Sequence, residues 1–395
     1  MIATGILVVI VALVFARLAY GLILPFMREG LGLDYQQAGN LGTAAALGYL
    51  CLIMASGIFA ARWGGNITIV IGALLSTTGF IGLSVSSDYY VLLAWMALLG
   101  FGTAFSYTPA ISLLVGWFPH RRAGVIGIAN SGAGIGLLLA GSLVPYLGQA
   151  FGAAGWRITW GVFALAGAMT AIAAYFLLPN PPALVAEGTA TKAAADRAIY
   201  RNRNVIRIGL LYAIIGSMYV VQAIFMYSFA LKAGLSGILA GRLAAMSGVL
   251  SIFSGPACGW LADRFGRRKI ILALVIADMV AMALPVIWPN LPGFGLHYFV
   301  IGAVMSGLFT VILAATTEAV TPAQAPVAVS YVTLFYAVAQ LICPALAGLL
   351  IERTGGFQPV FVSSAALIAV ALFLGFRLQL KTAGSSLENT AQSGT

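Results

Sequence analysis

The segment Gly57-Ile-Phe-Ala-Ala-Arg-Trp-Gly64 returns in altered form as Gly259-Trp-Leu-Ala-Asp-Arg-Phe-Gly266, 202 residues later in the chain. Each copy directly follows an apolar run that is long enough to cross a bilayer as a helix. A segment that recurs at the same place in two successive series of apolar runs indicates internal duplication. The repeat therefore predicts two related halves, as is common in membrane transporters.

The composition excludes a soluble protein. Of 395 residues, 61% are hydrophobic and only 8% are charged, whereas soluble domains carry about 25% charged residues. The chain is thus predicted to be an all-α polytopic membrane protein with the lipid bilayer as its solvent. The net charge of +10 does not indicate a nucleic-acid partner, because the basic residues occupy short gaps between apolar runs and form no continuous face.

Twelve apolar runs are long enough to span, and they divide evenly around a polar central segment. We expect a six-helix bundle over residues 1–179, a linker at 180–204, a second six-helix bundle over 205–379 and a disordered tail at 380–395. Asp34 and Gln37 are spaced as a capping box before the second run. The expected runs are 2–27, 36–61, 67–86, 89–117, 122–150, 157–178, 205–231, 236–262, 268–288, 296–319, 326–351 and 357–377.

The basic residues predict the orientation. One set of alternate loops and flanks holds 14 of the 20 Lys and Arg residues, and the opposite set holds 5. Cytoplasmic loops carry the excess of basic residues. Both termini are therefore expected in the cytoplasm, with the protein in the cell (inner) membrane.

Arg17 lies inside the first apolar run, at a depth where a charge costs about 2.5–3.5 kcal/mol on insertion scales. Two interpretations stay open. Arg17 could pair with a substrate carboxylate in a cavity, together with Tyr20 on the same helix face. It could instead bond backbone carbonyls or snorkel outward and fix the first helix. The repeat offset places Tyr219 opposite Arg17 across a pseudo-twofold axis.

Further polar residues within the runs are candidates for the same site, or alternatively for hydrogen bonds between helices. They are Tyr107, Asn130, Tyr219, Gln222, Tyr336 and Gln340. Two acids are candidates for ion coupling. Asp278 lies in the middle of the ninth run, and Glu318 lies at the end of the tenth, where a structural role in the loop network is the alternative.

The segment Gly259–Lys269, GWLADRFGRRK, closely resembles the loop signature of the major facilitator superfamily. The resemblance implies twelve helices in two pseudo-symmetric bundles around a central cavity. It also implies a cytoplasmic gate in which Asp263 and Arg264 form a charge relay, with Arg267 and Arg268 beside them and with Gly259 and Gly266 allowing tight turns. The first copy departs from the pattern, since Ala61 replaces the acid and Gly65-Asn66 replace the basic pair.

Two other segments narrow the resemblance. Residues 117–136, from WFPHRRAG to NSGAGIG, resemble the helix 4–5 region of monocarboxylate and oxalate/formate-type facilitators. The opening FARLAYGLILP and the segment GLDYQQAG resemble the bacterial YbfB/YjiJ-type group. Met96 stands where antiporters of the superfamily carry an arginine, which argues against a drug antiporter.

Together these features predict a secondary active transporter, not an enzyme, that moves a small organic anion resembling a monocarboxylate by alternating access. We expect a monomer without cofactor or metal, and a proton is the candidate co-substrate. An exporter of an amphiphilic or cationic compound is the alternative. A receptor or a membrane-embedded enzyme is disfavoured, because the sequence has no zinc spacing, nucleotide loop or Ser/His/Asp set. The solute, the direction and the coupling ion stay open.

Overall fold

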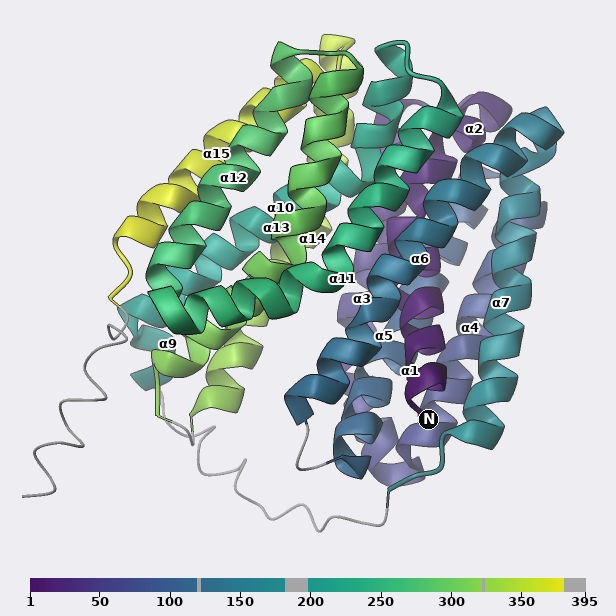
Figure 1. The fold of residues 1–395 in the computed structure, drawn as a ribbon. Coiled ribbons are helices and arrows are strands. Elements are labelled where there is room, and N and C mark those ends of the chain that lie inside the picture. Colours follow the sequence, from purple (N-terminus) through teal and green to yellow (C-terminus); the bar gives the residue numbers. More distant parts are fainter. Residues whose placement is uncertain (119–121, 182–197, 322–323, 380–395) are drawn as a thin grey trace, which may run out of the picture.

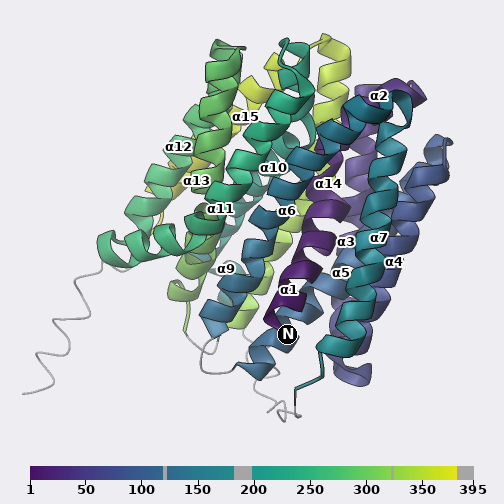
Figure 2. The ribbon, with the colours of Figure 1, turned by 45° about the vertical axis from the view of Figure 1, so that its right-hand side comes forward.

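The computed structural model describes residues 1–118, 122–181, 198–321 and 324–379, and their regular structure is entirely helical. The expected tail at 380–395 and most of the expected linker lie outside these ranges. The long helices run side by side, with Met1 and the short helix α9 at the same end (Figures 1 and 2). The elements are α1 Ile2–Val9, η1 Ile10–Leu18, α2 Tyr20–Leu31, α3 Tyr35–Trp63, α4 Gly65–Val85, α5 Tyr89–Trp117, α6 Arg122–Phe151, η2 Gly152–Ala154, α7 Gly155–Leu177, α9 Ala198–Arg201, α10 Arg203–Lys232, α11 Gly237–Phe265, α12 Arg267–Ile287, α13 Leu291–Glu318, α14 Ala325–Thr354 and α15 Gln358–Phe376.

The described residues confirm the predicted all-helical membrane fold. Ten stretches are long and apolar enough to span, and the first three elements add an eleventh span, bent by 42°. One of the ten, Gly124–Leu177, is 54 residues long and is interrupted by η2. There Gly152 adopts a φ of +52°, and the chain reverses so that α7 packs back against α6. Divided at this point, the described residues contain twelve spans.

The capping box predicted before α3 is present in the structure. The Asp34 carboxylate accepts a hydrogen bond from the Gln37 backbone N–H at 2.6 Å, and the Gln37 side chain accepts one from the Asp34 N–H at 3.0 Å. This capping box starts α3 by satisfying backbone donors that have no partner within the helix.

The repeat is visible in the backbone. Gly64 and Gly266 end α3 and α11 with φ of +92° and +93°, a conformation that side chains with a Cβ rarely adopt. The next helix, α4 or α12, begins at the following residue. Gly259 was expected to allow a turn as well, but it lies inside α11, so Gly266 alone forms this turn. We call the end of the bundle with Met1, Gly64 and Gly266 the junction end.

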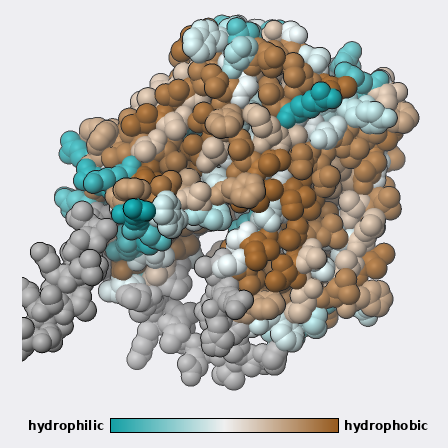
Figure 3. Space-filling model, viewed as in Figure 1, coloured by the Kyte–Doolittle hydropathy of each residue, from teal (hydrophilic) through white to brown (hydrophobic). Residues whose placement is uncertain are grey.

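Helices of the two halves meet at the end opposite the junction end. Along α6 and α11, Gly134 contacts Gly248 and Gly141 contacts Gly241, backbone to backbone. Nearer the junction end, a Cβ added at Gly124, Gly127 or Gly259 would meet no atom within 4 Å. α6 and α11 therefore diverge toward the junction end, and Figure 3 shows the surface hollowed between the two sets of helices there.

The helices α3 and α14, like α6 and α11, pack closely against each other through glycines. Gly39 packs against Pro344, and Gly348 packs against Tyr35. The Tyr35 backbone N–H donates to the Glu352 carboxylate at 3.0 Å, which joins the two halves at the far end. The flank of the molecule is mostly apolar in Figure 3. Exposed residues such as Leu165, Val362 and Phe373 are what lipid contact requires.

Candidate functional site

Arg17 sits on an irregular part of the first span. Residues Ile10–Leu18 wind as a π-helix, and the Ala19 N–H donates to the Val14 carbonyl at 2.8 Å, a bond five residues long. Such windings are rare and occur frequently at functional sites. The bend before α2 follows directly, so Arg17 lies where the helix changes both its pitch and its direction.

The Arg17 guanidinium reaches across to the other half of the chain. Its Nη2 donates to Gln340 Oε1 on α14 at 2.7 Å, and its Cζ lies 4.9 Å from the centroid of the Tyr49 ring on α3. Neither ion pair among the described residues includes Arg17. Of the two interpretations of the sequence, this geometry matches a cavity residue, since Arg17 is half-buried and bonded to a side chain rather than to backbone carbonyls.

Aromatic side chains from five helices, α3, α5, α10, α13 and α14, gather beside Arg17. The Tyr212 and Tyr336 rings stack at 4.6 Å with 21° between their planes. Phe309 presents its ring edge-to-face to Tyr212, Tyr219 and Tyr336, at 5.7, 5.4 and 5.8 Å. Electrostatic interactions connect Tyr49 and Tyr107 with Tyr212 and Tyr336. We call these six residues the aromatic cluster: Tyr49, Tyr107, Tyr212, Tyr219, Phe309 and Tyr336.

The aromatic cluster is linked to Arg17 through Gln340 and by charge. Gln340 follows Tyr336 by four residues on α14, so the two side chains share a helix face, and the Arg17 charge acts on Tyr219 and Tyr336. The structure thus brings five residues proposed from the sequence into one region: Arg17, Tyr107, Tyr219, Tyr336 and Gln340. A sixth, Asn130 on α6, accepts a hydrogen bond from the Tyr107 hydroxyl at 3.1 Å.

Two residues proposed from the sequence, Tyr20 and Gln222, make none of these contacts. The Tyr20 hydroxyl is buried and donates to the Ala38 carbonyl at 2.8 Å, where it ties α2 to α3. Gln222 is buried on α10, and its Oε1 has no hydrogen-bond partner in the part of the chain that the structure describes. Three members of the aromatic cluster, Tyr49, Tyr212 and Phe309, were not among the residues proposed from the sequence. For Tyr49, the available signal was its position at the middle of the second apolar run.

Asp278 is fully buried within α12, and neither of its carboxylate oxygens has a hydrogen-bond partner among the described residues. His297 of α13 is buried against the same helix, where its Nδ1 lies 2.7 Å from the Ala281 carbonyl oxygen. Among the described residues, none of the ring contacts within the aromatic cluster involves Asp278.

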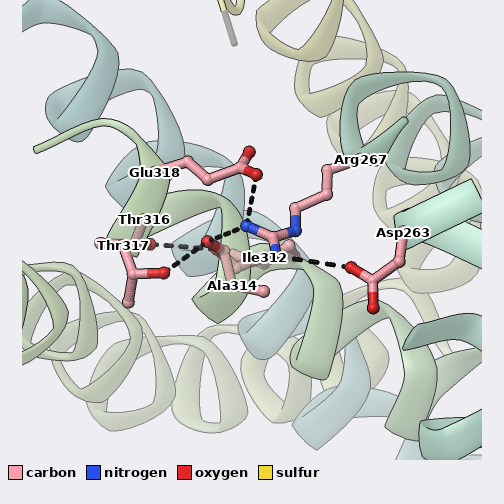
Figure 4. A network of polar contacts seen from close by, with 7 residues as sticks. All are labelled: Asp263, Arg267, Ile312, Ala314, Thr316, Thr317 and Glu318. Carbon is pink, nitrogen blue, oxygen red and sulfur yellow. Dashed lines mark hydrogen bonds and ion pairs between the residues drawn. The ribbon is translucent and has the colours of Figure 1, made fainter. Parts of the chain in front are cut away.

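The charged residues at the junction end form a network centred on Arg267 (Figure 4). Its guanidinium pairs with Glu318 at 2.6 Å and with Asp263 at 3.4 Å, and it also donates to the Ala314 carbonyl at 3.1 Å. The network therefore ties α11, α12 and the end of α13 together. Glu318 occupies the structural position that the sequence offered as one of its two roles.

The neighbouring basic residues act differently from Arg267. The Arg264 guanidinium lies over the rings of Trp260 and Phe265, at 5.4 and 5.6 Å, and forms neither of the ion pairs among the described residues. Arg268 donates to the Phe376 carbonyl at the end of α15, at 2.6 Å. The ion pair implied for Asp263 and Arg264 is made instead by Asp263, near the end of α11, and Arg267, at the start of α12, which the turn at Gly266 brings within 3.4 Å of each other.

A family model described as "Uncharacterised MFS-type transporter YbfB" matches residues 9–375, nearly the whole chain. The chain belongs to this family of the major facilitator superfamily. It is a multi-pass membrane protein that transports a small-molecule substrate, and it is not an enzyme.

Relatives and solved structures agree with this assignment. Human monocarboxylate transporter 6 is 28% identical over 375 residues, which cover 85% of this chain and 71% of that protein. Monocarboxylate transporter 2 of Meriones unguiculatus is 27% identical over 81% of this chain and 72% of its own length. In fold, the chain is similar to an inward-facing, unoccupied bacterial homologue of the lysosomal transporter Spinster (TM-score 0.79, 16% identity, 95% and 96% covered). It is likewise similar to a D-xylose–proton symporter (TM-score 0.77, 14% identity, 97% and 98% covered).

Proposed function

We propose that this transporter moves a small organic anion, similar to a monocarboxylate, and that Arg17 binds its carboxylate. The observation that carries the proposal is the partner of Arg17, a neutral amide at 2.7 Å rather than an acid. A guanidinium held away from water is best matched by a carboxylate, which can accept two parallel hydrogen bonds. The counter-charge would then arrive with the substrate.

The relatives support the chemical class, since proteins that match most of this chain bear the name monocarboxylate transporter. The aromatic cluster also supports it. Tyrosine hydroxyls can donate to the same anion, while their rings provide an apolar wall that does not compete for its charge.

Alternating access is the second part of the proposal. Residues 1–179 and 205–379 would rock as two bundles around the site, because Arg17 and Gln340 belong to different halves. The contacts at the far end and the divergence toward the junction end suit one of the two end states, with the site open on the junction side.

We place a monomer in the inner membrane with both termini in the cytoplasm, as the excess of basic residues favours. For proton coupling, Asp278 is the candidate in this proposal, since it is buried without a partner. Glu318 is engaged with Arg267 and would serve the gate together with Gly259, Asp263, Arg264, Gly266 and Arg268.

The experiment is uptake of labelled monocarboxylates and dicarboxylates into proteoliposomes by wild type, Arg17→Lys and Arg17→Gln. Removing a charged hydrogen-bonding partner costs about 1.5–3 kcal/mol, so Arg17→Gln should weaken half-saturation roughly 10- to 100-fold. Arg17→Lys keeps the charge but loses the planar fork and should fall between. Arg157→Lys is the matched control, because Arg157 bonds the Ser84 and Ser86 carbonyls far from the site.

A second variant supplies the counter-charge from within. Gln340→Glu would place a carboxylate on Arg17 and should block anion uptake while the fold persists. Wild-type anion uptake by this variant would contradict the proposal. Uptake of cations that survives Arg17→Gln would instead favour the alternative, an exporter of cationic or amphiphilic compounds.

A further inference from the structure

The aromatic cluster contains more ring surface than a small aliphatic acid would use. Its members come from both halves: Tyr49 and Tyr107 from the first, and Tyr212, Tyr219, Phe309 and Tyr336 from the second. Tyr49, Tyr107, Tyr219 and Tyr336 remain half-buried although they lie near the middle of long helices. Ring surface is therefore left open beside Arg17, at the depth where the halves diverge.

The charged point and the ring surface are separated by a defined distance. Gln340, which holds Arg17, follows Tyr336 by four residues on α14. One helical turn rises about 5.4 Å, so a ligand that replaces Gln340 at Arg17 and extends along α14 meets the Tyr336 ring within one turn. This span fits a ring joined to a carboxylate through one to three bonds.

The Tyr336 ring is held in place by α10 and α13. One face stacks on Tyr212 at 4.6 Å, and Phe309 contacts its edge. The ring also lies against Gly216 of α10, where any Cβ would collide with it. A fixed aromatic wall of this kind favours an aromatic guest, because edge-to-face and offset contacts between rings contribute beyond the area they bury.

We propose that the substrate is an aromatic monocarboxylate, its carboxylate on Arg17 and its ring against Tyr336 and Tyr212. This inference rests on the proposed function and narrows it from any small organic anion to one chemical class. Tyr336 is then the residue that determines specificity, since it lies four residues before Gln340 on the same helix and belongs to the ring stack.

The test compares ligands of matched size and charge. For the wild-type protein, two quantities are measured with phenylacetate, cyclohexylacetate and pyruvate. They are the shift in melting temperature and the inhibition of uptake of a labelled monocarboxylate. Phenylacetate should bind about 10-fold more tightly than cyclohexylacetate, which has the same carbon skeleton and charge but a saturated, non-planar ring. Equal binding of the two, or tighter binding of cyclohexylacetate, would overturn the inference.

Variants of Tyr336 test whether its ring causes the preference for the aromatic ligand. Tyr336→Leu should bring the ratio of phenylacetate to cyclohexylacetate affinity close to one, and Tyr336→Phe should retain it. Tyr331→Leu is the matched control on the same helix, because Tyr331 contacts Tyr200 and Phe335 instead of the aromatic cluster. Should Tyr336→Leu fail to fold, the wild-type ratio alone still decides.

The same data separate failure of this inference from failure of the proposed function. If pyruvate binds in an Arg17-dependent way and phenylacetate does not, the aromatic class is wrong and the anion transporter stands. If no carboxylate binds wild type, both proposals fall together.

Discussion

The turn that joins α3 to α4 and the turn that joins α11 to α12 have the same backbone but different chemistry. Each contains a glycine with φ near +90°. In each, a side chain two residues later bonds the end of its half's last helix: Asn66 donates to the Ala174 carbonyl at 3.0 Å, and Arg268 donates to the Phe376 carbonyl at 2.6 Å. These two acceptors are also 202 residues apart.

Among the residues that the structure describes, the charged network occurs only in the second half. Ala61, Gly65 and Gly116 occupy the positions equivalent to Asp263, Arg267 and Glu318. The glycine turn and the bond to the last helix are thus common requirements of the six-helix unit. The ion pairs are not required for that unit to form, because the first half forms it without them.

The largest effect is expected from the shared glycines. Alanine in such a backbone conformation costs about 1–3 kcal/mol. Gly64→Ala should be the more destabilising, because its Cβ would also collide with the Asn180 side chain, whereas a Cβ at Gly266 meets nothing within 4 Å. The apparent melting temperature in detergent measures this.

Each repeat supplies its own control for the glycine test. Gly57 and Gly259 are helical and have open space around an added Cβ. Alanine there should leave the melting temperature unchanged or raise it, since alanine is favoured over glycine in a helix by about 1 kcal/mol. A loss as large as that at Gly64 would show that the turn geometry is not what matters.

An intermediate effect is expected at the bond to the last helix. The Asn66 amide nitrogen donates to the Ala174, Tyr175 and Leu178 carbonyls, and Asn66→Ala should cost about 1–3 kcal/mol of unfolding free energy. Arg268→Ala loses a single exposed bond and should cost less. Asn66→Asp keeps the shape but removes the donors, so a stable Asn66→Asp protein would contradict this account.

The smallest effect on stability is expected at Arg267. Its partners are partly open to water, and exposed pairs contribute about 0–1 kcal/mol each. Arg267→Met should therefore lower the melting temperature slightly, and 1 M salt should narrow its difference from wild type because ions screen the pairs. Arg264→Met, at the same turn, should show no such salt dependence. A large, salt-independent loss at Arg267 would mean that the bond to the Ala314 carbonyl dominates.

Much of the fold was predictable because its signals are local or periodic. The twelve apolar runs, the Asp34–Gln37 capping box and the offset of 202 residues all read directly from the sequence. Arg17 was predictable as a candidate because a charge in an apolar run is expensive, whatever surrounds it. That its partner is Gln340, 323 residues away, depends on tertiary packing.

The errors in the site have physical causes. Tyr20 was placed on the face of Arg17 by α-helical spacing, but the helix is π-wound up to Leu18 and bends before Tyr20, so the two side chains no longer point the same way. The position of Tyr49 at the middle of the second apolar run did not decide its role, since a tyrosine in an apolar run can equally face lipid or a neighbouring helix. Asp263 pairs with Arg267 rather than with Arg264 because the chain turns at Gly266, and the direction of that turn cannot be derived from the order of the residues.

Because the backbones of α6 and α11 are in contact, adding one methyl group there would shift the equilibrium between the two conformers of the transporter. At Gly134 and Gly248 a Cβ would overlap the opposing carbonyl, but only while the far ends are together. A substituent that penalises one conformer shifts the ratio of conformers tenfold for each ~1.4 kcal/mol of differential cost. Gly248→Ala should therefore increase the population of the opposite-facing conformer. It does so without altering any charge or any residue of the site.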